Sequence, residues 1–154
     1  MSKNATLSAS MLFLVRVEDG KTQILLQKRA GNIWATGWWD SAASGHVDAG
    51  ESLTAAMQRE AKEEIAIEFS REDIEFIHIQ DSAQSGVPGT KMHYYNSYFF
   101  VNKWAGEPKI CECEKCSHLE WFNIDDLPKQ LIPNRRCAID CYLKKIAYNE
   151  FGWG

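Results

Sequence analysis

Three glutamates in one short segment have the residue type and spacing that a divalent-metal site requires. Glu60, Glu63 and Glu64 lie in the run Arg-Glu-Ala-Lys-Glu-Glu, and on a helix their side chains share an arc of roughly 100°. Like charges so close destabilise a helix, whereas carboxylate oxygens are the hard ligands that Mg²⁺ or Mn²⁺ prefers. The same composition is also typical of a solvated helix face. The run by itself therefore leaves both interpretations open.

The wider spacing around this run favours the metal site. Glycine, charged and aliphatic residues recur at fixed intervals, at Gly45, Glu51, Arg59, Glu60, Ala61, Glu63, Glu64 and Ile67. The charged and glycine positions alone would match by accident on the order of once in 10⁵ chains of this length. The pattern resembles the Nudix box and departs from it at Ala66, where that family has glycine. We expect a positive φ at Ala66 to cost about 1 kcal/mol, or the turn after the helix to differ.

Segments outside the box extend the resemblance. Residues 25–29 and 39–52 resemble the usual Nudix approach to the box, and residues 121–128 resemble the family's late strand and turn. The resemblance covers most of residues 9–145 and implies the Nudix α/β/α sandwich, an α+β fold with a mixed sheet flanked by helices. It also implies metal-dependent hydrolysis of a nucleoside diphosphate linked to another group.

The resemblance further implies roles for individual residues. It assigns Mg²⁺ or Mn²⁺ to the carbonyl oxygen of Gly45 and the carboxylates of Glu60, Glu63 and Glu64. Glu60 and Glu63 are also expected to act in catalysis, with Glu51 and Arg59 bracing them. Nudix enzymes often place another glutamate on a loop outside the box as ligand or general base. Glu114 is the first candidate for this role and Glu112 the second.

Candidate substrate contacts lie on both sides of the box. Lys28 and Arg29 are candidate cations for the phosphates, although ordinary strand-end charges explain them equally well. Trp39, Ile132 and Asn134 are candidate contacts for a base, because base recognition needs apolar platforms and polar groups that read an edge. For a large aromatic residue, packing in the core is the more common role.

Composition favours one domain that acts on a small molecule. The 154 residues, 45% of them hydrophobic, suit a single domain over residues 1–154. A net charge of -4 argues against a protein that grips a nucleic acid polymer. The apolar runs are too short for a signal peptide or a membrane span. We therefore expect a cytoplasmic monomer or homodimer that binds a small-molecule nucleotide.

The five cysteines are expected to be free thiols, because nothing in the sequence indicates export. Cys111, Cys113 and Cys116, with His118, also suggest a zinc site. Their spacing lacks a second pair of cysteines separated by two residues that would match Cys113 and Cys116, so we do not favour zinc.

Residue periodicity and turn signals predict the order of the elements. Strands are expected at 9–17, 22–28, 41–47, 74–80, 94–101 and 119–123, and helices at 51–65 and 135–148. An Asp-Gly pair at 19–20 predicts a tight hairpin turn. An ordered loop is expected over residues 30–40 and a long hairpin connection over residues 82–90.

The leading functional hypothesis is a MutT-like pyrophosphohydrolase that converts a nucleoside or deoxynucleoside triphosphate to monophosphate and pyrophosphate. Oxidised nucleotides are one candidate subset of these substrates. The alternatives are a nucleotide-sugar or ADP-ribose pyrophosphatase and a non-catalytic nucleotide-sensing Nudix module. Residues 39–46 also resemble isopentenyl-diphosphate isomerase-like Nudix proteins, in which isomerisation relies on a cysteine just before the box. This chain has no cysteine before Cys111, so we expect hydrolysis.

Overall fold

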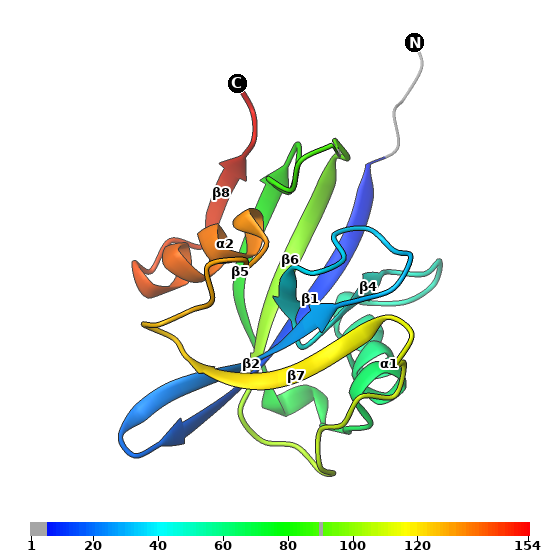
Figure 1. The fold of residues 1–154 in the computed structure, drawn as a ribbon, viewed down its shortest axis with the longest axis vertical. Helices are drawn as coiled ribbons and strands as arrows, with labels where there is room; N and C mark the ends of the chain where they lie inside the picture. Colours follow the sequence, from blue (N-terminus) through cyan, green and yellow to red (C-terminus); the bar gives the residue numbers. More distant parts are fainter. Residues whose placement is uncertain (1–5, 90) are drawn as a thin grey trace.

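Strands dominate the computed structural model, which describes residues 6–89 and 91–154 (Figure 1). The elements are β1 (Leu7–Glu18), β2 (Lys21–Arg29), β3 (Trp39–Ser41), β4 (Ala43–His46), α1 (Leu53–Ile65), a 3₁₀ turn (Arg71–Asp73), β5 (Ile74–Ser82), β6 (Tyr94–Val101), β7 (Cys116–Asn123), α2 (Pro133–Leu143) and β8 (Tyr148–Phe151). Within the described residues, no helix has the length and apolar character needed to cross a bilayer.

The long strand β1 joins two parts of one mixed sheet. Its first half runs parallel to β6, from the Leu7–Tyr94 pair to the Leu14–Val101 pair, and antiparallel to β4. Its second half pairs antiparallel with β2, which also binds β3 and β7. In Figure 1 the two parts splay apart: the strands β5, β6 and β8 lie close to vertical, whereas β2 and β7 cross the view.

Alternation along β1 sends successive side chains into two hydrophobic cores on opposite faces of the sheet. Leu12 packs in the core that contains Met57 of α1. Phe13 packs in the core that contains Ile139 of α2. One helix therefore lies over each face (Figure 1), and the predicted α+β sandwich is confirmed.

Most predicted elements of the first half are confirmed, with shifted ends. Asp19 and Gly20 have φ of 51° and 75°, as the predicted tight turn requires. The helix expected at 51–65 begins at Leu53. The single strand expected at 41–47 is instead two strands, β3 and β4, and β3 begins inside the segment expected to be a loop.

The helix predicted at 135–148 is wrong at both ends. Helix α2 begins at Pro133 and ends at Leu143, and Tyr148–Phe151 forms β8 parallel to β5. The backbone turns at Lys145, which has a φ of 60°. An edge strand of four residues carries little periodic signal, and its partner β5 is far away in the sequence.

Candidate active site

A cavity of about 600 Å³ brings all four predicted metal residues together. Its carboxylate end is lined by Glu60, Glu63, Glu64 and Glu112. Its wall contains two guanidinium groups, those of Arg29 and Arg135. A volume of this size is typical of small-molecule sites.

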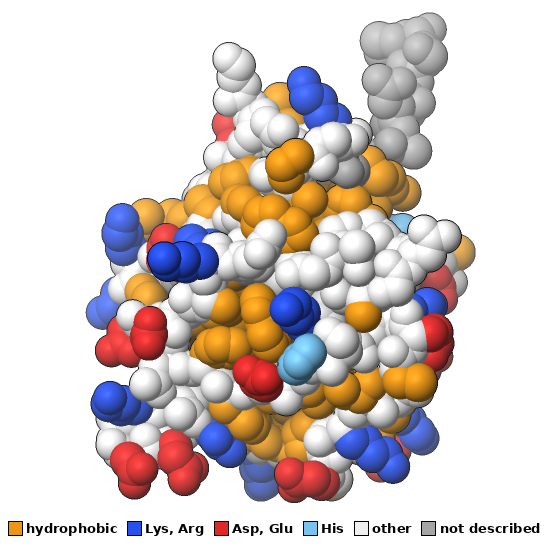
Figure 2. Space-filling view, in the orientation of Figure 1, with side chains coloured by type: hydrophobic (Ala, Val, Ile, Leu, Met, Phe, Trp, Pro, Cys, Tyr) orange, Lys and Arg blue, Asp and Glu red, His pale blue; other side chains and the backbone are white. Residues whose placement is uncertain are grey.

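The connection between β5 and β6 forms the less charged side of this cavity. Ser85 and Met92 lie in this connection and line the cavity, and Met92 is 47% exposed. Hydrophobic side chains gather over the upper ends of β5, β6 and β8 in Figure 2. The cavity therefore combines a carboxylate end at α1 with a side that suits an uncharged part of a ligand.

Helix α1 holds the box glutamates in register. Ser52 caps its first turn, because the Ser52 hydroxyl oxygen accepts a hydrogen bond from the Ala55 N–H at 3.1 Å. The helix ends at Ala66, whose φ of 60° and ψ of 36° are left-handed, and the Ala66 N–H donates to the Ala61 carbonyl. Of the two alternatives expected at this position, a positive φ or a different turn, the structure has the positive φ, on an alanine.

Arg59 joins the helix to the loop that precedes it. Its Nε donates to Glu51 Oε2 at 2.7 Å and its Nη1 to Glu60 Oε1 at 2.7 Å. Its Nη2 donates to the carbonyl of His46 at 3.2 Å. Hydrogen bonding from Arg59 lowers the pKa of Glu51 to about 2. These contacts have the geometry of the bracing role expected for Glu51 and Arg59.

Glu60 and Glu64 lie against the same strand, β4. The Ser44 N–H donates to Glu64 Oε2 at 2.8 Å. A Cβ on Gly45 would lie 2.1 Å from Oε1 of Glu60, so any side chain at this position would displace that carboxylate. Burial raises the pKa of Glu64 to about 8, and burial also raises the pKa of Glu60 in spite of its ion pair with Arg59. Both carboxylates therefore lack sufficient positive charge nearby.

The donor set fits a hard divalent cation, although it is not arranged as a finished metal site. Over residues 6–89 and 91–154, no three Asp, Glu, His or Cys side chains converge to hold a metal. Glu60 is held by Arg59, Glu64 by Ser44, and Glu63 is 57% exposed with its Oε2 3.5 Å from Arg59 Nη1. Burial disfavours the ionised form of these carboxylates, and a bound Mg²⁺ or Mn²⁺ would stabilise that form.

The cysteines expected as zinc candidates do not share one environment. Cys111 and Cys113 are exposed, whereas Cys116 is buried and its thiol donates to the His118 carbonyl at 3.2 Å. His118 Nδ1 contacts the Ser117 hydroxyl. In the part of the chain that the structure describes, these residues form no group that could hold a metal.

Glu112, our second candidate for the carboxylate outside the box, lines the cavity, and Glu114, our first, does not. The backbone N–H of Cys111 donates to the Glu64 carbonyl at 3.1 Å, which places Glu112 beside the end of α1. The chain then turns, with the Lys115 N–H donating to the Glu112 carbonyl at 2.9 Å. Glu114 is at the exposed tip of this turn, so the placement favours Glu112.

Of the two expected phosphate-binding cations, the structure brings only Arg29 to the cavity. Side chains alternate along β2, so Gln27 and Arg29 line the cavity while Lys28 does not. Lys28 Nζ lies 6.0 Å from the ring centroid of Trp39 instead. Trp39, expected to contact a base, packs edge-on against Phe122 in the core below α2. The structure therefore places Lys28 and Trp39 outside the lining of this cavity.

The two other base-contact candidates have different positions. Ile132 is completely buried and does not line the cavity, so it offers no surface to a ligand. Asn134 lines the cavity, but its amide is engaged at both ends: Nδ2 donates to the Ser82 hydroxyl at 3.0 Å, and Oδ1 accepts from Arg135 Nη1 at 2.9 Å. The contact with the edge of a base expected for Asn134 would therefore have to replace one of these hydrogen bonds.

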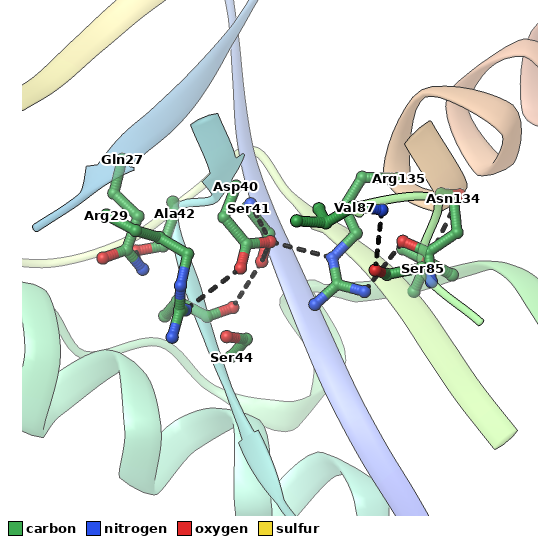
Figure 3. Close-up of polar contacts among 12 residues, drawn as sticks. Gln27, Arg29, Asp40, Ser41, Ala42, Ser44, Ser85, Val87, Asn134 and Arg135 are labelled. Carbon is green, nitrogen blue, oxygen red and sulfur yellow. Dashed lines mark hydrogen bonds and ion pairs between the residues drawn. The ribbon is translucent and has the colours of Figure 1, made fainter. Parts of the chain in front are cut away.

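Arg135 is the main cavity residue that the sequence does not indicate. Its Nε donates to Asp40 Oδ1 at 2.9 Å, and Arg29 Nη1 donates to Asp40 Oδ2 at 3.2 Å (Figure 3). The two arginines together hold the pKa of Asp40 below its usual value, against a burial effect that raises it. Arg135 and Asp40 are 95 positions apart, so no local spacing could have paired them.

Comparisons with known proteins agree with this geometry. The NUDIX domain family matches residues 9–140. Isopentenyl-diphosphate Delta-isomerase of Serratia proteamaculans is 26% identical over 123 residues, which are 79% of this chain. The chain spans 66% of that protein's length.

Solved structures share the fold. The MutT NUDIX hydrolase from Burkholderia pseudomallei is 28% identical, with a TM-score of 0.74 over 89% of this chain and 98% of that one. The NUDIX domain of NrtR from Shewanella oneidensis, in complex with ADP ribose, is 17% identical, with a TM-score of 0.70 over 94% of this chain and 91% of that domain. The second likeness concerns the fold alone.

Proposed function

Because this chain belongs to the NUDIX domain family and is a Nudix hydrolase, we propose that it cleaves a nucleoside or deoxynucleoside triphosphate to a monophosphate and pyrophosphate. The observation that carries this proposal is one cavity lined by four carboxylates at one end and two guanidinium groups in its wall. Carboxylates that hold divalent cations, together with arginines, match the charge of a polyphosphate. Oxidised nucleotides fall within the proposed class.

The proposed cation is Mg²⁺ or Mn²⁺. Its ligands would be the carbonyl oxygen of Gly45 and the carboxylates of Glu60, Glu63 and Glu64. Such an ion, when bound, neutralises charge on phosphate oxygens and makes a nearby water more acidic.

In the reaction that we propose, Glu112 is the general base. Water oxygen forms a bond to one phosphorus, the bridging P–O bond breaks, and the leaving phosphate oxygen keeps the electron pair. The Glu112 carboxylate takes the proton that the water loses. Lys115 Nζ lies 3.6 Å from Glu112 Oε2 and holds this carboxylate in place, while Arg59 holds Glu60 and the loop before α1.

The isomerase similarity does not change the proposed reaction. In isopentenyl-diphosphate isomerase-like Nudix proteins, isomerisation relies on a cysteine just before the box. This chain has no cysteine before Cys111. The five cysteines are free thiols, which suits the reducing cytoplasm that we propose as the location. The proposed partner is a small-molecule nucleotide.

The test is incubation of the pure protein with Mg²⁺ or Mn²⁺ and a panel of nucleoside triphosphates, nucleotide sugars and ADP-ribose. The reaction is run in ¹⁸O-labelled water, and mass spectrometry identifies the products and the labelled phosphate. We expect monophosphate and pyrophosphate from triphosphates, loss of activity with a chelator, and recovery with Mg²⁺ or Mn²⁺.

Other outcomes overturn the proposal in distinguishable ways. Cleavage of nucleotide sugars or ADP-ribose with intact triphosphates would indicate the alternative pyrophosphatase. Binding without turnover of any compound would indicate a nucleotide sensor. Recovery with Zn²⁺ alone would contradict the carboxylate site.

A further inference from the structure

Two arginines share one buried carboxylate in the cavity wall. Arg29 and Arg135 reach Asp40 from opposite sides in Figure 3, each through one of its carboxylate oxygens. The Asp40 side chain is completely buried, and the side chains of Arg29 and Arg135 are 19% and 7% exposed. Two positive charges therefore face one negative charge, and the cluster keeps one excess positive charge beside the cavity.

Trp34 fixes both guanidinium groups. Their Cζ atoms lie 5.1 Å (Arg29) and 5.7 Å (Arg135) from its ring centroid, and Arg29 Nε donates to the Trp34 carbonyl at 2.7 Å. The Trp34 indole Nε1 is buried and has no acceptor among the described residues. Trp34 also lines the cavity. Indole and guanidinium groups are all donors, and Asp40 accepts only one hydrogen bond from each arginine, so this wall has N–H groups left that an anion can satisfy.

A purely structural role for the cluster would need only one arginine. One guanidinium already neutralises Asp40, and a second one with little exposure loses hydration while it shares a carboxylate that is already paired. The other side-chain hydrogen bond of Arg135, to Asn134 Oδ1, is to a neutral amide. At the carboxylate end, Glu51 and Glu60 are paired with a different cation, Arg59. The excess positive charge is therefore available to a ligand.

We propose that Arg29 and Arg135 bind a third anionic group of the substrate, beyond the two phosphates engaged at the carboxylate end; this inference rests on the proposed function. A nucleoside triphosphate carries such a group in its third phosphate. A nucleotide sugar or ADP-ribose has two phosphates and no third. Arg135 is therefore the residue that makes the site selective for triphosphates over diphosphate-linked substrates.

The first test compares two substrates in matched variants. Arg135→Gln is expected to lower the ratio of kcat/KM for a nucleoside triphosphate to kcat/KM for ADP-ribose about 10–100-fold, because charge-assisted contacts to phosphate are lost. Arg135→Lys is expected to recover part of the ratio, since it keeps the charge without the planar fork. Asp40 retains Arg29 as a partner in both variants, and thermal unfolding checks that they fold.

The control is Arg136→Gln on the next residue. The Arg136 guanidinium donates to the Pro128 carbonyl and does not line the cavity, so its loss should leave the ratio unchanged. An equal change of the ratio in the Arg135 and Arg136 variants would overturn the proposal.

The second test needs no turnover. Inorganic tripolyphosphate and pyrophosphate are titrated by calorimetry, with Mg²⁺, into the wild type and Arg135→Gln. We expect tripolyphosphate binding to weaken about 10–100-fold and pyrophosphate binding to change less than about threefold. Equal weakening of both anions would overturn this inference even if triphosphates are hydrolysed. A wild type that hydrolyses no nucleotide while the selective loss is observed would instead refute only the proposed function.

Discussion

The carboxylate end of the cavity and its arginine wall are built in different ways. Gly45, Glu60 and Glu64 come from one continuous segment, in which β4 is followed by a loop and α1. Arg29, Asp40 and Arg135 come from β2, β3 and α2, and their contacts form only when the sandwich closes. Local spacing therefore reveals a site that one helix positions, whereas it does not reveal a site that forms only when distant segments come together in the fold.

The two regions also differ in electrostatics. Burial raises the pKa of Glu64 to about 8, because the ionised carboxylate lacks a cation. Burial also acts to raise the pKa of Asp40, but two guanidinium groups outweigh it and the pKa is lowered. The carboxylate end is therefore suited to a cation and the arginine wall to an anion. Substitutions at the carboxylate end and in its supporting segments test this contrast.

The largest expected effect is on turnover, through the carboxylate end. Glu60→Gln or Glu63→Gln removes a charged oxygen ligand and should lower kcat about 10²–10⁴-fold while the fold persists. Steady-state kinetics and circular dichroism measure the two properties. The matched control is Glu68→Gln, just after α1, because Glu68 pairs with Lys62 outside the cavity and should not affect kcat. Wild-type turnover in Glu63→Gln would remove the assignment.

The next largest effect on kcat is expected from the glutamate outside the box. Glu112→Gln should lower kcat about 10–100-fold, because it removes the proposed base beside Glu60 and Glu64. Glu114→Gln is the control on the same turn and should remain within about twofold of wild type. The reverse ranking of these two variants in steady-state assays would restore Glu114, our first candidate.

The fold and the carboxylate end can be predicted because their signals are local. Helix α1 carries apolar positions at helical spacing, a serine cap and no internal glycine or proline. The Asp19-Gly20 turn needs positive φ, which the residue types indicate directly. A resemblance carried by one continuous motif then implies the sandwich.

The rest depends on contacts between distant segments. The predicted bounds of helix α2 are too late and too long, because the turn at Lys145 and the edge strand β8 depend on pairing with β5. In the sequence, Arg135 is indistinguishable from an ordinary helix arginine, and only the fold brings Asp40 beside it. Glu112 and Glu114 cannot be ranked from the sequence, because the Cys111–Glu64 backbone contact decides which of them reaches the cavity.

A smaller effect is a pH dependence of unfolding in the metal-free protein. Glu64 has a pKa of about 8 when folded and an ordinary value near 4.5 when unfolded. Its contribution to stability is therefore fully present below pH 4.5 and is lost as pH rises through 8. In EDTA, the free energy of unfolding should fall between pH 5 and 8, by an amount on the order of 1–3 kcal/mol.

The contribution of Glu64 to this pH dependence of the unfolding free energy can be isolated with one variant and one ligand. Glu64→Gln cannot ionise, so its unfolding free energy from denaturant titrations should vary less over this range. Mg²⁺ should reduce the loss in wild type, because a bound cation favours the ionised carboxylate. Asp40 should not contribute, since its lowered pKa keeps it ionised throughout. Equal slopes for wild type and Glu64→Gln would show that ionisation of Glu64 does not cause the loss of stability.

The smallest effect lies in the backbone at the end of α1. Ala66 has a φ of 60°, a conformation that glycine adopts without steric strain. Ala66→Gly should therefore raise the free energy of unfolding by about 1 kcal/mol and leave kcat unchanged, because Ala66 does not line the cavity. Ala55→Gly, in the right-handed part of the same helix, should instead lower it by a similar amount. Denaturant titrations of both variants measure these opposite changes in the free energy of unfolding. If both glycines destabilise, the carboxylate end does not hold local strain at Ala66, and the alanine there is favoured by packing instead.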